Sequence, residues 1–234
     1  MIHKESQQAG VAEWFNKTYA TRGERYLRPA KAYLVFLELL KVKPGQQLLD
    51  VACGMGRLLE AAKTYECNLT GIDISKIAVD KAREKVPEAS LHVGNAECLP
   101  FNDGQFEIVT CIGSLERFLE VKNALHEMHR VGSAQASYCV LVRNANTAIW
   151  KYVYEGLNLR NKQGHQDAKT LQQWNALFTD NGFEVVEVIP DQYPLQKRKK
   201  WLSLGLKSID YRAVIPSRLP LACANEFIFM LRKS

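Results

Sequence analysis

The residues best placed for chemistry are two glycines that follow an apolar segment. Residues 47–51 are largely apolar, and Gly54 and Gly56 come just after them, ahead of a helix-like segment at 57–64. Glycine adopts backbone angles that other residues avoid, and it lets a ligand approach the main chain closely. A turn of this kind lies at the carboxyl end of its strand, where open α/β sheets bind ligands. The pattern therefore predicts a ligand-binding loop at Gly54 and Gly56.

Two polar side chains stand at the ends of the next two apolar segments. Asp73 lies at the end of segment 69–74, and we expect its carboxylate to accept two hydrogen bonds from a ribose diol, as the equivalent acid does in dinucleotide-binding folds. Asn95 follows the segment 89–93, and we expect its amide to contact an adenine edge. Together with the glycine turn, these residues predict a ligand that contains a nucleoside.

The elements that would hold these residues alternate along the chain. The sequence predicts strands at 47–51, 69–74, 89–93, 106–112 and 138–142, and helices at 57–64, 75–85 and 121–131. A helix at 29–41 precedes this series, and a helix at 170–181 with strands at 183–189 and 226–231 follows it. Strands that alternate with helices predict a parallel sheet covered on both faces.

The remaining segments suggest how the chain is divided. We interpret residues 1–28, which are polar and aromatic, as an N-terminal cap segment on a single ligand-binding domain at 29–234. Within that domain, 146–168 is interpreted as an insertion on the substrate side and 191–220 as a basic segment.

Length and composition limit the function classes. A chain of 234 residues with 47% hydrophobic residues suits one α/β domain, and its core needs neither a disulfide nor a metal. The net charge of +6 is small and much of it lies in the run 197–200, so we expect no nucleic-acid partner. The six cysteines form no C-x-x-C pair, and there is no apolar leader or membrane-spanning stretch. We therefore expect a cytoplasmic protein with no membrane partner.

Four motifs stand in a characteristic order. They are Asp50-x-x-Cys53-Gly54-x-Gly56, then Gly71-Ile72-Asp73-Ile74, then Gly94-Asn95-Ala96-Glu97, and finally Cys111-Ile112-Gly113-Ser114-Leu115-Glu116-Arg117-Phe118. In this order they resemble the class I S-adenosylmethionine-dependent methyltransferases of the small-molecule type, strongly over 30–145 and more weakly over 170–232. The resemblance implies an α/β fold with a doubly wound, mostly parallel seven-stranded sheet, helices on both faces and an antiparallel C-terminal strand. It also implies S-adenosylmethionine as cofactor and a small molecule as methyl acceptor.

The same resemblance assigns residues to the cofactor. It implies that the first motif is the cofactor loop, that Asp73 binds the ribose and that Asn95 meets the adenine amino group. Most members of the family have aspartate at the position of Asn95, but the amide oxygen of Asn95 can still accept the bond from the adenine amino group. Many members have histidine at the position of Arg117. The expected cofactor-binding residues are Tyr19, Arg28, Asp50, Ala52, Cys53, Gly54, Gly56, Asp73, Ile74, Asn95, Ala96, Glu97, Cys111 and Ile112.

A sulfonium cofactor gives the N-terminal segment an expected role. Aromatic faces attract cations and arginines hold carboxylates, so we expect residues 10–28 to order over the cofactor and complete the site. The alternative is a helix that is permanently packed on the core. A general base is needed only when the nucleophile starts protonated. The candidates for catalysis are Tyr19, Glu116, Asn144 and His165.

Several other functions stay open at this point. The cofactor motifs also suit attack on another carbon of the sulfonium, such as cyclisation of the aminobutyryl arm with release of methylthioadenosine. A macromolecular (RNA or protein) methyltransferase that uses the run 197–200 is a second alternative, and a non-catalytic binding module is a third. A nicotinamide dehydrogenase is disfavoured, because Leu59 takes the place of the third glycine of G-x-G-x-x-G. No metal site is expected, because His126 and His129 are three residues apart rather than four.

Overall fold

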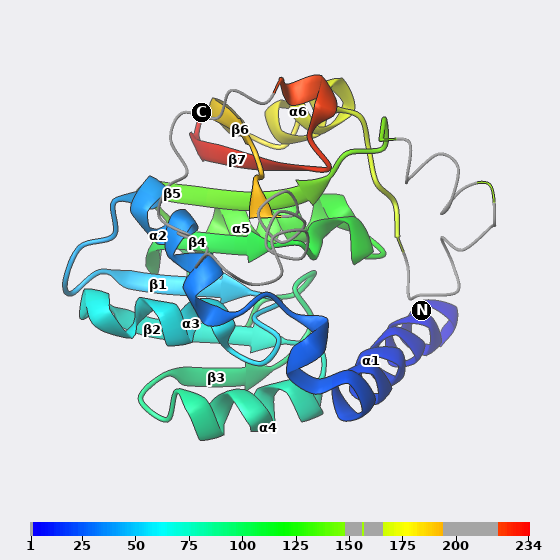
Figure 1. Ribbon diagram of the computed structural model, residues 1–234, viewed down its shortest axis with the longest axis vertical. Coiled ribbons are helices and arrows are strands. Elements are labelled where there is room, and N and C mark those ends of the chain that lie inside the picture. Colours follow the sequence, from blue (N-terminus) through cyan, green and yellow to red (C-terminus); the bar gives the residue numbers. More distant parts are fainter. Residues whose placement is uncertain (1, 148–155, 157–165, 194–219) are drawn as a thin grey trace, which may run out of the picture.

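A computed structural model describes residues 2–147, 156, 166–193 and 220–234 of the chain. Its centre is a seven-stranded sheet in the order β3-β2-β1-β4-β5-β7-β6 (Figure 1). The strands are β1 Gln47–Val51, β2 Asn68–Asp73, β3 Ser90–Val93, β4 Phe106–Ile112, β5 Gly132–Arg143, β6 Phe183–Pro190 and β7 Glu226–Lys233. Neighbouring strands from β3 to β5 are parallel, while β7 runs antiparallel to both β5 and β6. The predicted fold class is therefore confirmed.

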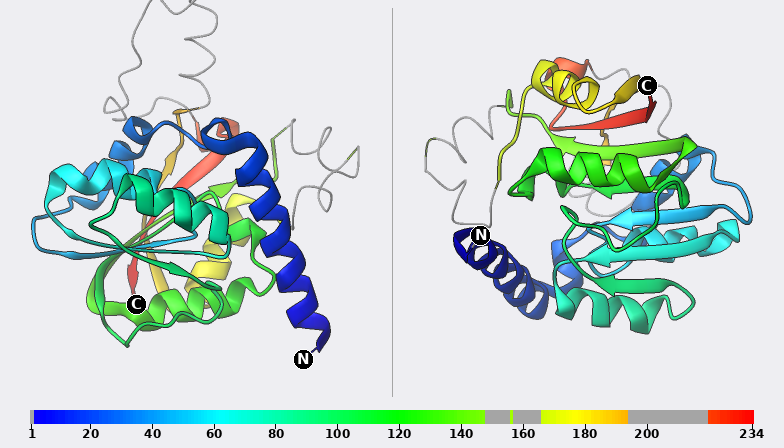
Figure 2. Two further views of the ribbon diagram at one scale, coloured as in Figure 1. Left: turned by 90° about the horizontal axis from the view of Figure 1, so that it is seen from below. Right: turned by 180° about the vertical axis from the view of Figure 1, so that it is seen from behind.

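Helices cover the two faces of the sheet (Figure 2), and two apolar cores lie beneath them. One core lies between the sheet and the helices α5 and α6, and the other lies between the sheet and α2, α3 and α4. The helices are α1 Ile2–Arg22, α2 Leu34–Leu40, α3 Arg57–Ala62, α4 Lys76–Lys85, α5 Val121–Val131 and α6 Leu171–Thr179, with short 3-10 turns that include η1 Gly23–Tyr26 and η4 Leu115–Arg117. None of the helices in the described residues is long and apolar enough to cross a membrane.

Local sequence signals explain where several elements begin and end. The Ser75 hydroxyl accepts a hydrogen bond from the Ala78 N–H and caps α4. Thr170 and Gln173 form a reciprocal capping box at the start of α6. Gly182, at a φ of 82°, allows the turn from α6 into β6. β5 begins at Gly132, whereas the sequence predicted that this strand starts at residue 138. The predicted start was wrong because the first residues of β5 are small or polar and show no apolar alternation.

The N-terminal segment forms one long helix, α1, which the sequence analysis considered only as the alternative for residues 10–28. α1 lies beyond the carboxyl ends of β1, β2 and β3 (Figures 1 and 2). The Asn16 Oδ1 atom accepts hydrogen bonds from the Ser75 hydroxyl at 2.7 Å and from the Ile77 N–H at 3.2 Å. The Lys81 ammonium donates to the Tyr19 carbonyl oxygen at 2.8 Å. These bonds fix α1 to the first turns of α4, at the edge of the sheet where the glycine turn lies.

Candidate cofactor site

The glycine turn links β1 to α3 through three residues with positive φ. They are Ala52 at 58°, Gly54 at 53° and Gly56 at 73°, and the turn is tied to β2 by the bond from the Cys53 N–H to the Ile72 carbonyl oxygen at 3.0 Å. A Cβ on Gly54 would lie only 2.7 Å from the Tyr19 hydroxyl oxygen. Glycine at 54 is therefore required both by the backbone angle and by the side chain that α1 places against it.

Asp73, the last residue of β2, organises this turn. Its buried carboxylate accepts hydrogen bonds from the Gly54 N–H through Oδ2 and from the Ser75 N–H through Oδ1, each at 2.8 Å. Each carboxylate oxygen has a second lone pair, so Asp73 can still accept bonds from a diol. Burial raises the Asp73 pKa to about 6, although both N–H bonds act in the opposite direction.

Asp50 lies nearby on β1 and is also buried. The Thr110 hydroxyl donates to its Oδ1 atom at 2.7 Å. Burial raises the Asp50 pKa to about 7, against the lowering effect of the Thr110 bond and with a further increase from the charge of Asp73. Two carboxylates with raised pKa values therefore flank the glycine turn, where a cationic ligand would favour their ionised forms.

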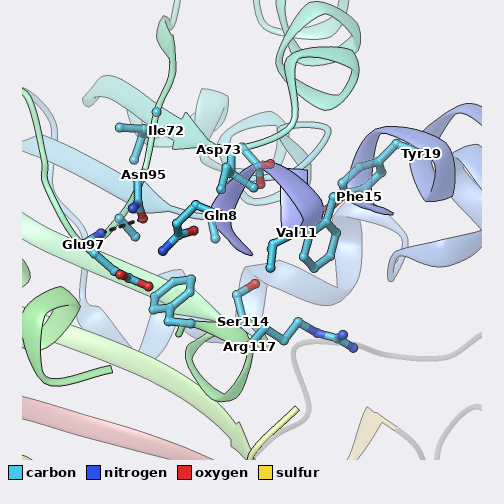
Figure 3. Close-up of a pocket in the computed structure, with 15 residues that line it drawn as sticks. Gln8, Val11, Phe15, Tyr19, Ile72, Asp73, Asn95, Glu97, Ser114 and Arg117 are labelled. Carbon is cyan, nitrogen blue, oxygen red and sulfur yellow. Dashed lines mark hydrogen bonds between the residues drawn. The ribbon is translucent and has the colours of Figure 1, made fainter. Parts of the chain in front are cut away.

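Two small cavities lie on either side of Tyr19 and Phe15. The first, of about 40 Å³, is lined by α1 and by the ends of β2 and β3, and it is shown in Figure 3. The second, of about 60 Å³, is lined by the glycine turn, Asp50, Tyr33 and the end of β4. Ser114 and Arg117 line both cavities. The two cavities are thus two halves of one site, roofed by α1.

The first cavity combines apolar walls with polar groups that suit a nucleobase. Ile72, Ala96 and Phe118 are among its apolar side chains. The Asn95 Oδ1 atom accepts a bond from the Glu97 N–H at 3.0 Å, drawn as a dashed line in Figure 3. Asn95 is therefore held in one orientation at the cavity wall, as recognition of an adenine edge would require.

The residues present fit S-adenosylmethionine. The apolar first cavity suits the adenine, and Asp73 lines this cavity and accepts a bond from Gly54 of the second one, as a ribose position would require. The second cavity presents Asp50 and aromatic rings to a cationic methionine part. The missing Cβ at Gly54 lets the backbone approach the ligand. Asp50, Asp73 and Asn95 would hold the cofactor, with Tyr19 covering it.

Most of the sequence-predicted cofactor residues come together here. Those that line the two cavities are Tyr19, Asp50, Ala52, Cys53, Gly54, Asp73, Ile74, Asn95, Ala96, Glu97 and Ile112. Gly56 and Cys111 do not line them; Gly56 instead permits close packing, since its Cβ would lie 3.1 Å from the Ala82 Cβ. The role of each residue toward the cofactor stays a prediction.

Other predicted residues are placed differently. Arg28 donates to Asp191 and Glu226 and lines neither cavity, which does not favour its predicted contact with the cofactor. The Asn144 side chain donates to the Ala224 carbonyl oxygen at 2.8 Å and accepts from the Asn146 N–H at 2.9 Å, so it is occupied by the local loop. His165 lies outside the described residues. Glu116 is buried beside the site but lines neither cavity.

The sequence analysis missed the contribution of the first turns of α1. Gln8 and Val11 line the first cavity, together with Phe15 and Tyr19 (Figure 3). Residues 8, 11, 15 and 19 recur at intervals of three or four and so share one face of the helix. This spacing was the signal that could have identified the helix and the face it turns to the site.

Comparisons with known proteins indicate the class of the domain that carries this site. Residues 49–139 match a family model described as a methyltransferase domain. The uncharacterized methyltransferase YcgJ of Bacillus subtilis is 24% identical over 190 residues, which are 79% of this chain and 75% of that protein. A demethylmenaquinone methyltransferase of Listeria welshimeri is 34% identical over 129 residues, 50% of this chain. The chain matches only 54% of the length of that relative.

A solved structure shares the fold over nearly the whole chain. It is described as a SAM-dependent methyltransferase, possible histamine N-methyltransferase, from Thermotoga maritima, with a TM-score of 0.69 at 16% identity. The match covers 96% of this chain and 100% of that one. The fold is the Rossmann-like fold of that structure, and residues 49–139 form a methyltransferase domain. Together with the methyltransferase relatives, this match confirms the predicted class and its cofactor, S-adenosylmethionine.

Removing the Asp73 carboxylate should weaken cofactor binding. We expect Asp73→Ala to lower the affinity for S-adenosylmethionine by about 10- to 100-fold, because a charged acceptor is lost and the Gly54 N–H loses its partner. Calorimetric titration of the folded variant measures this change. Asp80→Ala is the matched control, since Asp80 is an exposed residue of α4 that pairs only with surface cations among the described residues. Equal affinities for the two variants would contradict the assignment.

Cofactor affinity should also rise with pH. A cofactor that carries a sulfonium and an ammonium favours ionised carboxylates, and the Asp50 pKa is about 7. Binding of S-adenosylmethionine at pH 6 should therefore be about tenfold weaker than at pH 8. Calorimetry across this range tests the expectation, and Asp50→Asn should reduce the dependence. An affinity for S-adenosylmethionine that stays constant from pH 6 to pH 8 would refute this expectation.

The stability of the cofactor-free protein should change in the opposite direction. The pKa values of Asp50 and Asp73 in the folded protein, about 7 and 6, both exceed the ordinary value of 3.8. The folded state therefore binds more protons than the unfolded state between these values, and the free energy of unfolding falls as the pH rises through that window. Thermal denaturation of wild type and of Asp50→Asn should show that the variant loses part of this pH dependence.

Proposed function

We propose that this protein transfers a methyl group from S-adenosylmethionine to a small-molecule acceptor in the cytoplasm, without a nucleic-acid partner. The observation that carries the proposal is the bond between Asp73 and the Gly54 N–H, in a cavity pair that α1 roofs with Tyr19. The proposal is supported by the methyltransferase domain match and by the small, enclosed form of the site. A site that α1 covers is more accessible to a small acceptor than to a macromolecule.

The residues of the chain would act mainly by binding and orientation. When bound, S-adenosylmethionine supplies an already activated methyl group on a sulfonium. Asp50 and Asp73 would hold the cationic ligand, and the rings of Phe15 and Tyr19, stacked 6.2 Å apart, would offer faces to the sulfonium. α1 would exclude water from the reacting atoms, and a fixed orientation of acceptor and methyl group can supply much of the rate enhancement.

The alternative functions predict different products. Incubation of the protein with S-adenosylmethionine and a library of small acceptors, followed by mass spectrometry, tests the proposal. S-adenosylhomocysteine formed only with an acceptor is the expected result. Methylthioadenosine formed without an acceptor would replace methyl transfer with attack on the aminobutyryl arm. The run 197–200, on which the macromolecular alternative depends, lies outside the described residues.

A further inference from the structure

Among the described residues that line the cofactor site, one side-chain nitrogen is buried without a hydrogen-bond partner. It is the Nε2 atom of Gln8, on the face of α1 that lines the first cavity. The other such atoms in the described residues belong to Arg57, Glu116 and Tyr138, which line neither half of the site. A buried amide nitrogen without a partner is costly unless a ligand or a water supplies the missing bond. The position of Gln8 therefore indicates a ligand atom that accepts this bond in the first cavity.

The Gln8 side chain extends from α1 toward Asn95 and Glu97, which line the same cavity (Figure 3). Both of these residues take part in local hydrogen bonds. The Asn95 Oδ1 atom accepts from the Glu97 N–H, and the Glu97 Oε1 atom accepts from the Glu120 N–H, each at 3.0 Å. Neither bond involves Gln8, so its amide keeps a donor for a group that enters the cavity.

The charges around the first cavity favour a neutral partner for this donor. The charged residues that line the cavity are Asp73, Glu97 and Arg117. Arg117 lies over the Phe15 ring, with 5.7 Å from its guanidinium carbon to the ring centroid, and in Figure 3 it extends away from Glu97. The Gln8 amide extends toward the Glu97 carboxylate instead, and that carboxylate would repel an anionic ligand group. The ring nitrogens of adenine are acceptors that carry no charge.

We propose that Gln8 is a specificity residue for the nucleobase of the cofactor, and that its Nε2 atom donates to N1 or N7, the ring nitrogens that flank the adenine amino group. The amino group itself would donate to Asn95, so two side-chain amides would recognise a donor and an acceptor that are neighbours on one base. This inference rests on the cofactor placement within the proposed function, and it does not depend on the identity of the methyl acceptor.

The same bond would tie the first turns of α1 to the ligand. The hydrogen bonds of Asn16 and Tyr19 fix α1 to α4, and Gln8 lies about two helical turns before Asn16. A base that pairs with Gln8 would therefore hold the part of α1 that lies farthest from these bonds. Recognition of the base and closure of the site would then be coupled.

Two deaza analogues of S-adenosylhomocysteine test the proposal, because each replaces one ring nitrogen by C–H and keeps the amino group. Wild type is titrated by calorimetry with S-adenosylhomocysteine and with its 1-deaza and 7-deaza analogues. We expect one of the analogues to bind about tenfold more weakly than S-adenosylhomocysteine, because it leaves the buried Gln8 donor unpaired. The weaker analogue identifies the ring nitrogen. Equal binding of all three ligands to wild type overturns the inference.

Gln8→Leu removes the amide and keeps a side chain of similar size. Gln7→Leu is the matched control, because Gln7 is an exposed residue of α1 that lines neither cavity. Gln8→Leu should bind the three ligands with nearly equal affinity, whereas Gln7→Leu should keep the preference of wild type. A Gln8→Leu variant with the full tenfold preference would contradict the role of the amide.

Thermal stability separates recognition of a ligand from a structural role. Without ligand, Gln8→Leu should melt at the Tm of wild type or above it, because the buried donor that it removes has no protein partner and leucine favours the helix. Saturation with S-adenosylhomocysteine should then raise the Tm less in Gln8→Leu than in wild type. A ligand-free variant with a lower Tm than wild type would show that the amide has a structural partner, and the proposal would be wrong.

The Asp73→Ala variant distinguishes the two levels of failure. If Asp73→Ala binds S-adenosylhomocysteine as tightly as wild type, the cofactor placement is wrong and the role of Gln8 fails with it. If Asp73→Ala binds weakly and the preference among the three ligands is the same in wild type and Gln8→Leu, only the role of Gln8 fails.

Discussion

Gly54→Val is expected to reduce the affinity for S-adenosylmethionine by about a hundredfold or more, because it combines backbone strain with a steric block. Gly54 has a φ of 53°, which a β-branched residue rarely adopts, and its Cβ would lie 2.7 Å from the Tyr19 hydroxyl oxygen. The added methyl groups would project into the space between the turn and α1, where we propose that the cofactor lies. Calorimetric titration with S-adenosylmethionine measures the loss.

A second glycine provides the control for strain alone. Gly45 has a φ of 79°, and a Cβ built on it would meet no atom within 4 Å. Gly45→Val should therefore lower the Tm while leaving cofactor affinity unchanged. If Gly54→Val bound the cofactor as tightly as Gly45→Val does, the glycine turn would not be the cofactor site.

Deleting residues 2–22 should leave a folded domain whose kcat/KM is lower by about a hundredfold or more, as expected when reacting groups lose their alignment. α1 contributes four side chains to the first cavity. Its own apolar contacts form a small cluster around Tyr19, Met55 and Ala78, separate from the two large cores on the faces of the sheet. Removal of α1 should therefore spare the sheet, which circular dichroism can verify. Activity is measured as S-adenosylhomocysteine release with an accepted substrate.

Limited proteolysis distinguishes a mobile roof from a permanently packed helix. A roof that opens to admit the cofactor should be cut within residues 10–28 in the free protein and protected by S-adenosylhomocysteine, because the ligand stabilises the closed state. Asn16→Ala removes the acceptor that joins α1 to Ser75 and should increase cleavage in the free protein. Identical cleavage with and without ligand, or full activity of the truncated chain, would exclude the roof.

The sequence predicted the sheet well because its strands and helices follow simple periodicities. β1, β4 and α5 have the predicted bounds, and the motif residues at the ends of β1 and β2 lie beside each other as expected. These agreements arise because parallel strands all present their carboxyl ends at one edge. The helical state of residues 2–9 was missed, because α1 packs along the cofactor site rather than on the large cores and has no continuous apolar stripe.

Contacts between distant segments could not be predicted from one sequence. Arg28 was assigned to the cofactor from its neighbours in the chain, yet its partners Asp191 and Glu226 lie more than 160 residues away. Glu116 was a candidate only through its motif. That neither of its carboxylate oxygens has a hydrogen-bond partner among the described residues is a property of the folded state, since it depends on which other side chains reach the same buried volume.

The position of β7 has a consequence for how the chain assembles during synthesis. β7 lies between β5 and β6, and it is the only strand that β6 contacts in the described sheet. Until residues 226–233 leave the ribosome, β6 has no partner and the α5–α6 face of the core is incomplete. Glu226 also reaches Arg28 only when β7 is inserted, so this ion pair forms at the same late step. A nascent chain stopped before residue 226 would therefore expose the edges of β5 and β6, which quality-control proteases and chaperones recognise.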